Sequence, residues 1–370
     1  MKTPDTYPIS ANEEELLSEV GYQPDNQRAG TSVIVDHDVK YSQTNTELVE
    51  VMPLQQALEK YDWVQDLVFG LIDPEENDHI RQAAETVHDP VGHFIWVKEG
   101  ADVKLPIQKF SLLEVPQRRQ FNHDITVIEK GAKVEIIAGS AVPKTVRAGH
   151  HISISETYIH EEAECRFITI EHWGEGMEVN GYSRTKMEKN ARCTSKKVMI
   201  NPIKQHYSQS KSYLQEGASS RDESIIFSPM NSHYEMESEC YLQGKGAESE
   251  SLARMVSAGG NIVNKALLIG ESAESKGFIG CDGLKLSDNG EILSIPGLLA
   301  KDAKAQLSHE ASIGMVSAEK IAYLMATGMN EDAARSLLIQ GFLNLKEEHM
   351  PNSVRDSVTR MVDIAKSGAM

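Results

Sequence analysis

The sequence predicts a mostly β protein whose core is a β-solenoid, with helical segments at both ends. Three observations predict this fold. A polar turn ending in alanine recurs at nearly constant intervals, short β-prone runs follow most of these turns, and helical periodicity is confined to the two ends of the chain. We therefore divide the chain into a mixed and helical N-terminal region (1–104), a β-helix core (105–312) and a C-terminal helical region (313–370).

The N-terminal region predicts three helices. Residues 11–20 form a short acidic segment, and Pro53 suits the first turn of a second helix. Apolar residues then follow at spacings of three or four up to Gly70. A third helix is expected from residue 74 to about residue 87. This region carries no recognisable chemical motif.

The core is predicted from its repeat. The alanines that end the turns follow one another at nearly equal intervals, and β-prone runs occupy 133–139, 151–159, 165–173 and 223–227. Strands with no regular helix between them favour a β-helix over a leucine-rich horseshoe. The turns end at Ala132, Ala163, Ala191, Ala218, Ala247, Ala273 and Ala303.

The C-terminal region predicts a helical hairpin. Ser317 can cap a helix that runs through Met325, and Gly328 can end it. Asn330 can cap the next helix, which carries Ala333, Ala334, Leu337, Leu338 and Phe342. A third helix is expected over 351–366. The hairpin either caps the last coil or presents a docking face to a partner.

Composition narrows the classes of function. Lys and Arg number 37 and Asp and Glu 55, a net charge of −18 over 370 residues, which argues against nucleic acid or an anionic membrane as partner. No apolar run is long enough to span a membrane, and the first ten residues do not resemble a signal peptide. We expect a cytoplasmic protein whose four cysteines are thiols.

The spacing of the cysteines predicts where they lie. Residues one repeat apart on stacked coils are about 4.8 Å from each other. Cys165 and Cys193 each lie two positions after a repeat alanine, so we expect them in register on adjacent coils. His309 and Glu310 follow Cys281 by about the same interval that separates Cys165 from Cys193, which predicts that they lie beside Cys281 on the next coil. A thiolate, an imidazole and a carboxylate would then converge, and such donors suit iron or sulfur chemistry.

Other interpretations of these residues remain open. A single cysteine in a solenoid is often a small core residue. Cys165 and Cys193 can be stacked filler, and Cys240 falls outside the repeat phase of the others. The histidines within 150–173 lie among carboxylates, but alternation along a strand divides them between two faces, which disfavours a metal site there.

Motifs of common enzymes are missing from the sequence. It has no C-x-x-C pair, no phosphate-binding loop with Gly-Lys-Ser/Thr and no nucleophile elbow. The sequence therefore offers little support for a hydrolase, a kinase or a dehydrogenase.

The segment 300–343 carries the clearest family resemblance. Its marker residues are His309, Glu310, Ala311, Tyr323, Leu324, Gly328, Glu331, Ala334, Gly341 and Phe342. In this pattern the chain resembles the SufB/SufD family of the Suf iron–sulfur cluster assembly machinery. Cys281–Asp282 and Ile295–Pro296 also stand where that family places them, and weaker similarity reaches back to about residue 105.

The resemblance implies a right-handed parallel β-helix that serves as a scaffold for nascent iron–sulfur clusters and is not itself an enzyme. The partner would be an ABC-type ATPase, SufC, docked through about 317–343, and ATP hydrolysis would belong to that partner. A second SufB/SufD-type subunit would pair through the β-helix. The short chain is similar to the archaeal form, which implies a homodimer, and a cysteine desulfurase is a candidate sulfur donor.

The resemblance also implies the site. Cysteine at 281 and glutamate after His309 are typical of the cluster-building SufB branch, whereas the SufD branch has glycine there. Cys281 would accept sulfur and bind iron, Glu310 would supply an oxygen ligand, and His309 would be a ligand or a base. Asp282, Cys193 and Cys240 are further candidate ligands, and the cluster would be transient and lost in air.

Two other functions stay open from the sequence. The first is a SufD-like interaction subunit that holds no cluster but binds the ATPase and a sister scaffold. The second and more distant one is a β-helix enzyme acting on carbohydrate, which the N-terminus disfavours.

Overall fold

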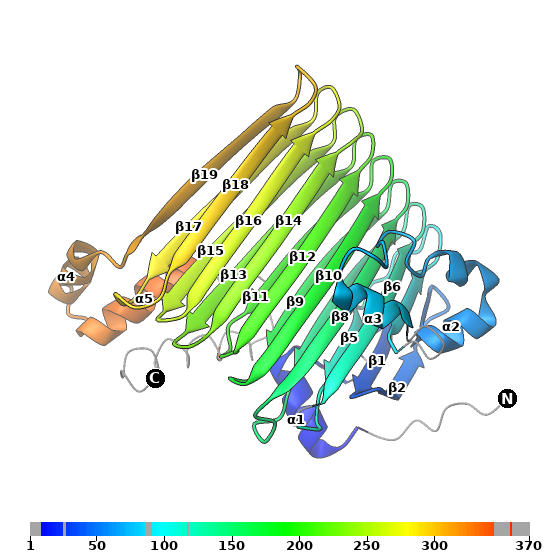
Figure 1. The fold of residues 1–370 in the computed structure, drawn as a ribbon, viewed down its shortest axis with the longest axis horizontal. Helices are drawn as coiled ribbons and strands as arrows, with labels where there is room; N and C mark the ends of the chain where they lie inside the picture. The colour runs from blue at the N-terminus through cyan, green and yellow to red at the C-terminus, as the bar shows by residue number, and fades with distance from the viewer. Residues whose placement is uncertain (1–8, 25–26, 86–90, 117, 344–355, 357–370) are drawn as a thin grey trace.

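The fold is a two-faced β-solenoid. The computed structural model describes residues 9–24, 27–85, 91–116, 118–343 and 356. Of the described residues, 52% lie in strands and 16% in helices, and the solenoid has about eight turns with helices at both ends. Strands alternate along the chain between two sheets, so that each coil adds one strand to each of them (Figure 1). The predicted fold class is confirmed.

Sheet A is the ten-stranded sheet of the solenoid. From β5 onward its neighbouring strands are parallel, whereas β1 and β2 pair antiparallel at its N-terminal edge. Its strands are β1 (Gly30–Val35), β2 (Asp38–Thr44), β5 (Ile107–Leu112), β7 (Lys133–Ala141), β9 (Glu164–His172), β11 (Arg192–Met199), β13 (Ser219–Pro229), β15 (Glu248–Ala258), β17 (Lys276–Lys285) and β19 (Gln306–Met315).

Sheet B is the nine-stranded sheet that faces sheet A across the interior. It too begins with an antiparallel pair, β3 and β4, and continues as parallel strands. Its strands are β3 (Val49–Pro53), β4 (His93–Val97), β6 (Arg119–Ile128), β8 (Gly149–Ile159), β10 (Met177–Met187), β12 (Gln205–Leu214), β14 (His233–Leu242), β16 (Asn261–Gly270) and β18 (Ile292–Ala300).

The repeat turn has a physical cause in its backbone. The residue before each of the first five repeat alanines has a positive φ of 56° to 68°, which reverses the chain within one tight turn. Each following alanine is fully buried, because only a small side chain fits inside the corner. These alanines are Ala132, Ala163, Ala191, Ala218 and Ala247.

The last two turns of the repeat are assigned differently by the structure. The N–H of Gln306 bonds the carbonyl of Ser275, just as that of Lys276 bonds Ala247. The residues that continue the ladder are therefore Ser275 and Ala305, not Ala273 and Ala303. In the turns before β17 and β19, the corner residue lies two positions after the alanine that the sequence pattern marked. The alanine pattern alone does not show this shift.

The N-terminal region is more β-rich than the sequence predicted. Its helices are α1 (Ala11–Glu19), α2 (Leu54–Lys60), the 3₁₀ helix η2 (Asp62–Asp66) and α3 (Asp78–Glu85). The helix at 11–20 is confirmed, with a Ser10–Glu13 capping box. The helix expected over 53–70 ends at Lys60, and the one over 74–87 begins at Asp78. Strands β1 to β4 were not predicted, because no repeat turn marks them.

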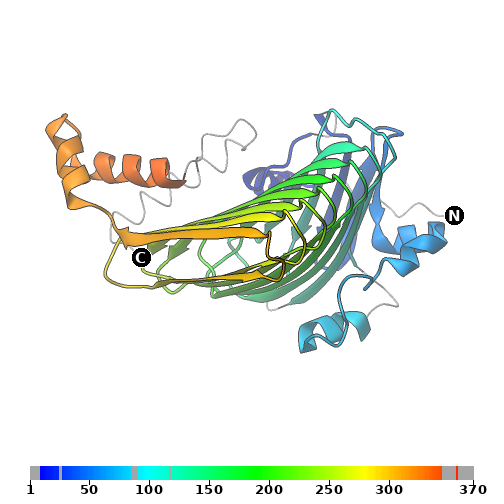
Figure 2. The same ribbon diagram turned by 90° about the horizontal axis from the view of Figure 1, so that it is seen from above.

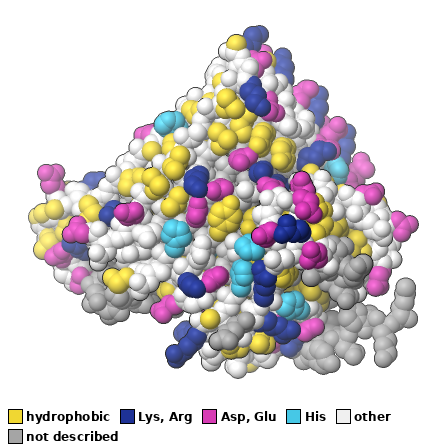
Figure 3. Space-filling view, viewed as in Figure 1, with side chains coloured by type: hydrophobic (Ala, Val, Ile, Leu, Met, Phe, Trp, Pro, Cys, Tyr) yellow, Lys and Arg dark blue, Asp and Glu magenta, His cyan; other side chains and the backbone are white. Residues whose placement is uncertain are grey.

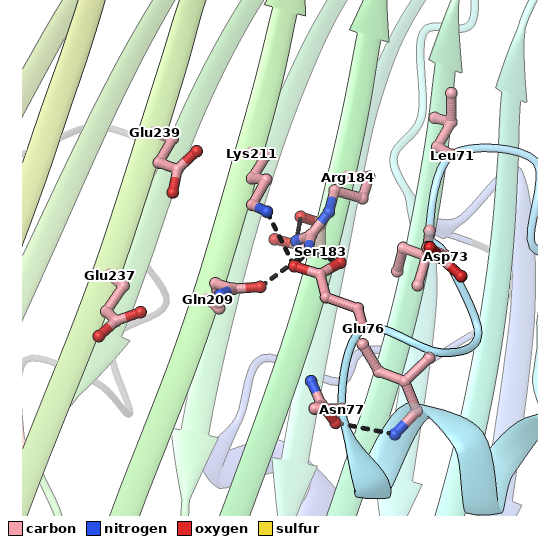
Figure 4. A network of polar contacts seen from close by, with 12 residues as sticks. Leu71, Asp73, Glu76, Asn77, Ser183, Arg184, Gln209, Lys211, Glu237 and Glu239 are labelled. Atoms are coloured by element: carbon pink, nitrogen blue, oxygen red, sulfur yellow. Dashed lines mark hydrogen bonds and ion pairs between the residues drawn. The ribbon is translucent and has the colours of Figure 1, made fainter.

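A polar network ties the segment before α3 to the outer face of sheet B (Figure 4). Arg184 on β10, only 1% exposed, donates to both carboxylate oxygens of Glu76 at 2.8 and 2.7 Å. Lys211 on β12 donates to the same carboxylate at 2.8 Å, and Gln209 accepts from Arg184 at 2.7 Å. The buried guanidinium is therefore paired by groups from two other elements.

A second anchor holds the loop after η2. The Glu156 carboxylate on β8 is fully buried and accepts the backbone N–H groups of Phe69, Leu71 and Ile72 at 2.7, 2.6 and 3.2 Å. His123 Nε2 lies 2.8 Å from the same carboxylate. One side chain of the solenoid thus satisfies three loop amides.

The C-terminal hairpin consists of α4 (Ala318–Ala326) and α5 (Glu331–Leu343). The predicted caps are confirmed, because Ser317 accepts from the N–H of Lys320 and Asn330 accepts from that of Ala333. Helix α5 belongs to the apolar cluster on sheet A that includes Phe227 and Val256, whereas α4 projects beyond the last coil (Figure 2). The helix expected over 351–366 lies outside the described residues, except for residue 356.

Candidate functional site

Cys281 lies inside the solenoid near its C-terminal end. It is 1% exposed, in the middle of β17, and its register partners are Ala253 on β15 and Ala311 on β19. Across the interior, the Nδ2 of Asn264 on β16 donates a hydrogen bond to its sulfur at 3.4 Å. Only one further strand of sheet A separates this thiol from the end of the solenoid.

The other predicted ligands divide between two faces. The register of β17 and β19 pairs His309 with Ile279 and Glu310 with Gly280, so neither lies directly beside Cys281. Because side chains alternate along a strand, His309 lies on the interior side with Cys281, and Glu310 lies on the outer side with Asp282. The structure therefore brings together Cys281 with His309, and separately Asp282 with Glu310.

The last coil is open. Every residue of β19 except Leu307 is exposed, and β18 consists of half-buried and exposed residues throughout. His309 and Glu310 both lie on the uncovered strand β19. A second molecule can therefore contact His309 and Glu310 at the open end and supply the donors that are missing there.

The other three cysteines lie around one ladder of sheet A. Cys165 and Cys193 are in register on β9 and β11, as predicted, and Ser220 and Ser249 continue the ladder on β13 and β15. Cys240 projects from sheet B and its thiol is hydrogen-bonded to Ser249 and Ser220. Burial raises the pKa of Cys240 to about 12. The hydrogen bond to Cys165, together with burial, raises the pKa of Cys193 well above its usual range.

This cysteine ladder is distant from Cys281. The ladder continues from Ser249 to Gly277 on β17, and Cys281 lies four positions further along that strand. Cys193 is thus three strands away, about 14 Å across the sheet, and about 13 Å along it. Within one chain, the structure does not bring Cys193 or Cys165 to Cys281.

The histidines within 150–173 are occupied by separate partners. His151 bonds Gln120 at 2.7 Å, and burial lowers its pKa to about 4, while His160 lies between Glu129 and Glu188. No group of three or more His, Cys, Asp or Glu side chains among the described residues is arranged to hold a metal ion. A site that binds iron would therefore need donors in addition to any single group that the described residues form.

Sequence reasoning missed Asn264, the residue that contacts the Cys281 sulfur. It lies 17 positions before Cys281 on the opposite sheet, and the repeat spacing relates only residues of one sheet. No signal in the sequence indicates which residues face each other across the interior.

The helical hairpin exposes an apolar surface. Tyr323 is 71% exposed, Met325 44% and Leu337 46%, and Ile321 is the only described residue of α4 that is buried. Side chains of this kind are costly to leave in water and mark a surface for another protein. Within the described residues no helix is both long and apolar enough to cross a membrane.

Fold and site together define a class of protein. The chain combines a β-solenoid, one buried thiol near its open end and an exposed apolar hairpin. The family model described as "SUF system FeS cluster assembly, SufBD core domain" matches residues 112–342. The chain belongs to the SufBD family of iron–sulfur cluster assembly proteins.

Relatives match nearly the whole chain. An iron–sulfur cluster assembly SufBD family protein of Archaeoglobus fulgidus is 32% identical over 96% of this chain and 95% of its own length. One from Methanothermobacter thermautotrophicus is 29% identical over 96% and 88%. One from Staphylococcus aureus is 22% identical over 92% and 75%. The chain is therefore closer in length to the archaeal relatives than to this bacterial one.

Proposed function

We propose that this protein is a SufB-like scaffold that binds a nascent iron–sulfur cluster as cargo in the cytoplasm. The observation that supports the proposal most strongly is the place of Cys281. It is the described thiol nearest the open end, and the Asn264 amide already donates to its sulfur. Cys281 would receive sulfur and bind iron as a thiolate, and His309 on the same face would bind or orient the cargo.

The split donor set supports a shared site. Asp282 and Glu310 lie on the outer face of the same two strands, where their carboxylates can meet a second subunit. Two copies that pair through their open last coils would bring two sets of donors together. A homodimer is therefore the arrangement we propose, with each chain supplying part of the ligand set.

The hairpin supports an ATPase partner. Its exposed apolar side chains require a cover, and α5 fixes the hairpin to sheet A through Ile339 and Leu343. We assign residues 317–343 as the docking surface of a SufC-like ATPase. ATP hydrolysis would then occur on the partner, and a cysteine desulfurase would be a source of sulfur.

The test is anaerobic reconstitution with ferrous iron and sulfide. Wild type should gain iron, acid-labile sulfide and visible absorption, and Cys281→Ser should lose most of each. Cys240→Ser is the matched control, because it removes an interior thiol of sheet B that is hydrogen-bonded to Ser249 and Ser220 rather than to Cys281. A Cys281→Ser variant that binds as much iron and sulfide as wild type would contradict the proposed site.

The SufD-like function is the second candidate. The observation that favours it is that no described group of donors in one chain can hold a metal unaided. It predicts that wild type takes up no iron, either alone or with the ATPase bound, but still binds the ATPase tightly.

A further inference from the structure

Cys165 and Cys193 form a buried pair of thiols outside the Cys281 site. They are register partners on adjacent strands, 3% and 8% exposed, and their thiols are hydrogen-bonded to each other. Both are free cysteines. In-register neighbours in a sheet have Cα atoms about 4.8 Å apart, within the range of about 4.4 to 6.8 Å that a disulfide requires.

The pair lies beside a groove. The groove has a volume of about 930 Å³ and runs across the first residues of the sheet A strands, with both cysteines among its lining residues. Three arginines line the same part of it, namely Arg166, Arg192 and Arg221. Arg166 and Arg221 pair with Glu135 and Glu250, whereas Arg192 makes no side-chain ion pair with the described residues. A small anionic sulfur donor would therefore meet a positive charge next to Cys193.

We propose that Cys165 and Cys193 are a dithiol site that reduces sulfane sulfur to sulfide. This inference rests on the proposed scaffold function, because a cluster contains sulfide whereas persulfide donors deliver sulfur at the oxidation level of zero. The site would take a persulfide or polysulfide, and it would hand sulfide to the interior of the solenoid.

The chemistry balances with the two thiols alone. One cysteine sulfur attacks the terminal sulfur of the donor persulfide or polysulfide and becomes a persulfide, while the donor's S–S bond breaks and the rest of the donor leaves, as a thiol or a shorter polysulfide, with the cysteine's proton. The sulfur of its partner attacks the inner sulfur of that persulfide, a Cys165–Cys193 disulfide forms, and the outer sulfur leaves with the partner's proton as hydrogen sulfide. The two electrons come from the two thiols, and a dithiol reductant restores them. The raised pKa of Cys193 keeps the thiol of that residue protonated at rest.

The experiment treats reduced, iron-free protein with inorganic polysulfide in the absence of oxygen, followed by removal of excess reagent. Wild type should release sulfide and yield a cross-linked peptide joining Cys165 to Cys193 that is two hydrogen atoms lighter than its two component peptides together. Cys193→Ser and Cys165→Ser should each retain one added sulfur atom on the remaining cysteine and release roughly tenfold less sulfide. Both variants should fold, because serine occupies the same ladder position at Ser220 and Ser249.

A matched control and the absence of iron separate this inference from the cluster site. Cys240→Ser should release as much sulfide as wild type, since it does not remove a member of the pair. Because the assay contains no iron, failure of cluster binding does not affect it. A wild type that keeps a stable persulfide without the cross-link, or single variants that release as much sulfide as wild type, would overturn the proposal.

Discussion

The two ends of the solenoid are built in opposite ways. At the N-terminal end, antiparallel pairs close both sheets, and the loops after η2 are tied down by Glu156 and Arg184. At the C-terminal end, β18 and β19 are uncovered, and Ile313 and Met315 are 42% and 51% exposed. One end is thus anchored within the chain, and the other is left open.

The outer face of sheet B shows the same contrast. Near the loops after η2 it carries the Arg184–Glu76 ion pair, whereas over the last two strands it carries mostly apolar residues beside Lys265, which pairs with Glu235 (Figure 3). The exposed apolar residues there are Leu267, Leu293, Ile295 and Leu299. A free protein keeps such a surface when another molecule covers it in the working assembly. The comparison therefore links stability to the N-terminal end, and the exposed apolar surface supports the partners proposed for the C-terminal end.

The largest effect is expected when the N-terminal anchor is broken. Glu156→Ala leaves three loop N–H groups and His123 without their buried acceptor, so we expect a loss of about 3 to 5 kcal/mol in the free energy of unfolding. Urea unfolding followed by circular dichroism measures it. Glu161→Ala, which removes an exposed partner of Lys130, is the control and should leave the curve unchanged. A loss no larger than that of the control would contradict the anchor.

Acid should weaken the same end of the molecule. Burial lowers the pKa of both His93 and His151 to about 4. Histidine in the unfolded chain takes up a proton below its ordinary pKa of about 6.5, whereas these two imidazoles stay neutral in the folded chain down to about pH 4. Their contribution to the free energy of unfolding is therefore fully present above pH 6.5 and decreases as the pH falls to about 4. Each of the two histidines should lower the free energy of unfolding by about 2 kcal/mol between pH 7.5 and pH 5. His93→Asn should reduce the loss of stability between the two pH values, measured from the urea midpoint at each pH. An unchanged loss would contradict the role of His93.

Asp124 extends this acid sensitivity to lower pH. Although burial by itself raises its pKa, the Lys109 ammonium at 2.8 Å and the charge of His93 hold the pKa at about 2. The stability contributed by this carboxylate is present above pH 4 and is lost only as the pH falls towards 2. The histidines therefore titrate first.

The smallest effect on stability is expected at the C-terminal hairpin. Tyr323→Ala removes an exposed side chain, so the free energy of unfolding should change by less than about 0.5 kcal/mol. Binding of the purified partner ATPase should weaken by roughly tenfold or more, measured by titration calorimetry. Leu48→Ala, which removes an exposed apolar side chain at the other end, should not alter binding. Equal binding by Tyr323→Ala and wild type would exclude this residue from the docking surface.

Much of the fold was predictable from the sequence, because its elements are specified locally. The caps of α1, α4 and α5 depend on residues within three positions, and the five alanine corners depend on one tight turn each. Strands β1 to β4 lack such corners and were missed. The long N-terminal helix was wrong, because tertiary contacts of the region end α2 at Lys60 and redirect the following residues over sheet B.

The candidate site was predictable only where the spacing of the repeat holds. Cys165 and Cys193 were placed correctly because the turn between their strands follows the alanine pattern. His309 and Glu310 were placed two positions out of register, because the coil that joins β17 to β19 is longer than the coil that joins β9 to β11. Because side chains alternate along a strand, this shift of two positions leaves His309 on the face of Cys281, whereas Glu310, one position further along, lies on the other face.

The sequence by itself determined the class of fold, the family and which residues carry sulfur and oxygen donors. These follow from local turn chemistry and from motifs that are contiguous in the chain. Only the tertiary structure decided that Asn264 meets the Cys281 sulfur, that Glu310 faces away from it, and that one end of the solenoid is open. The physical reason is that the corners joining the two sheets vary in length. Which residues meet across the interior therefore depends on the lengths of all the corners and strands between them, and not on any single segment.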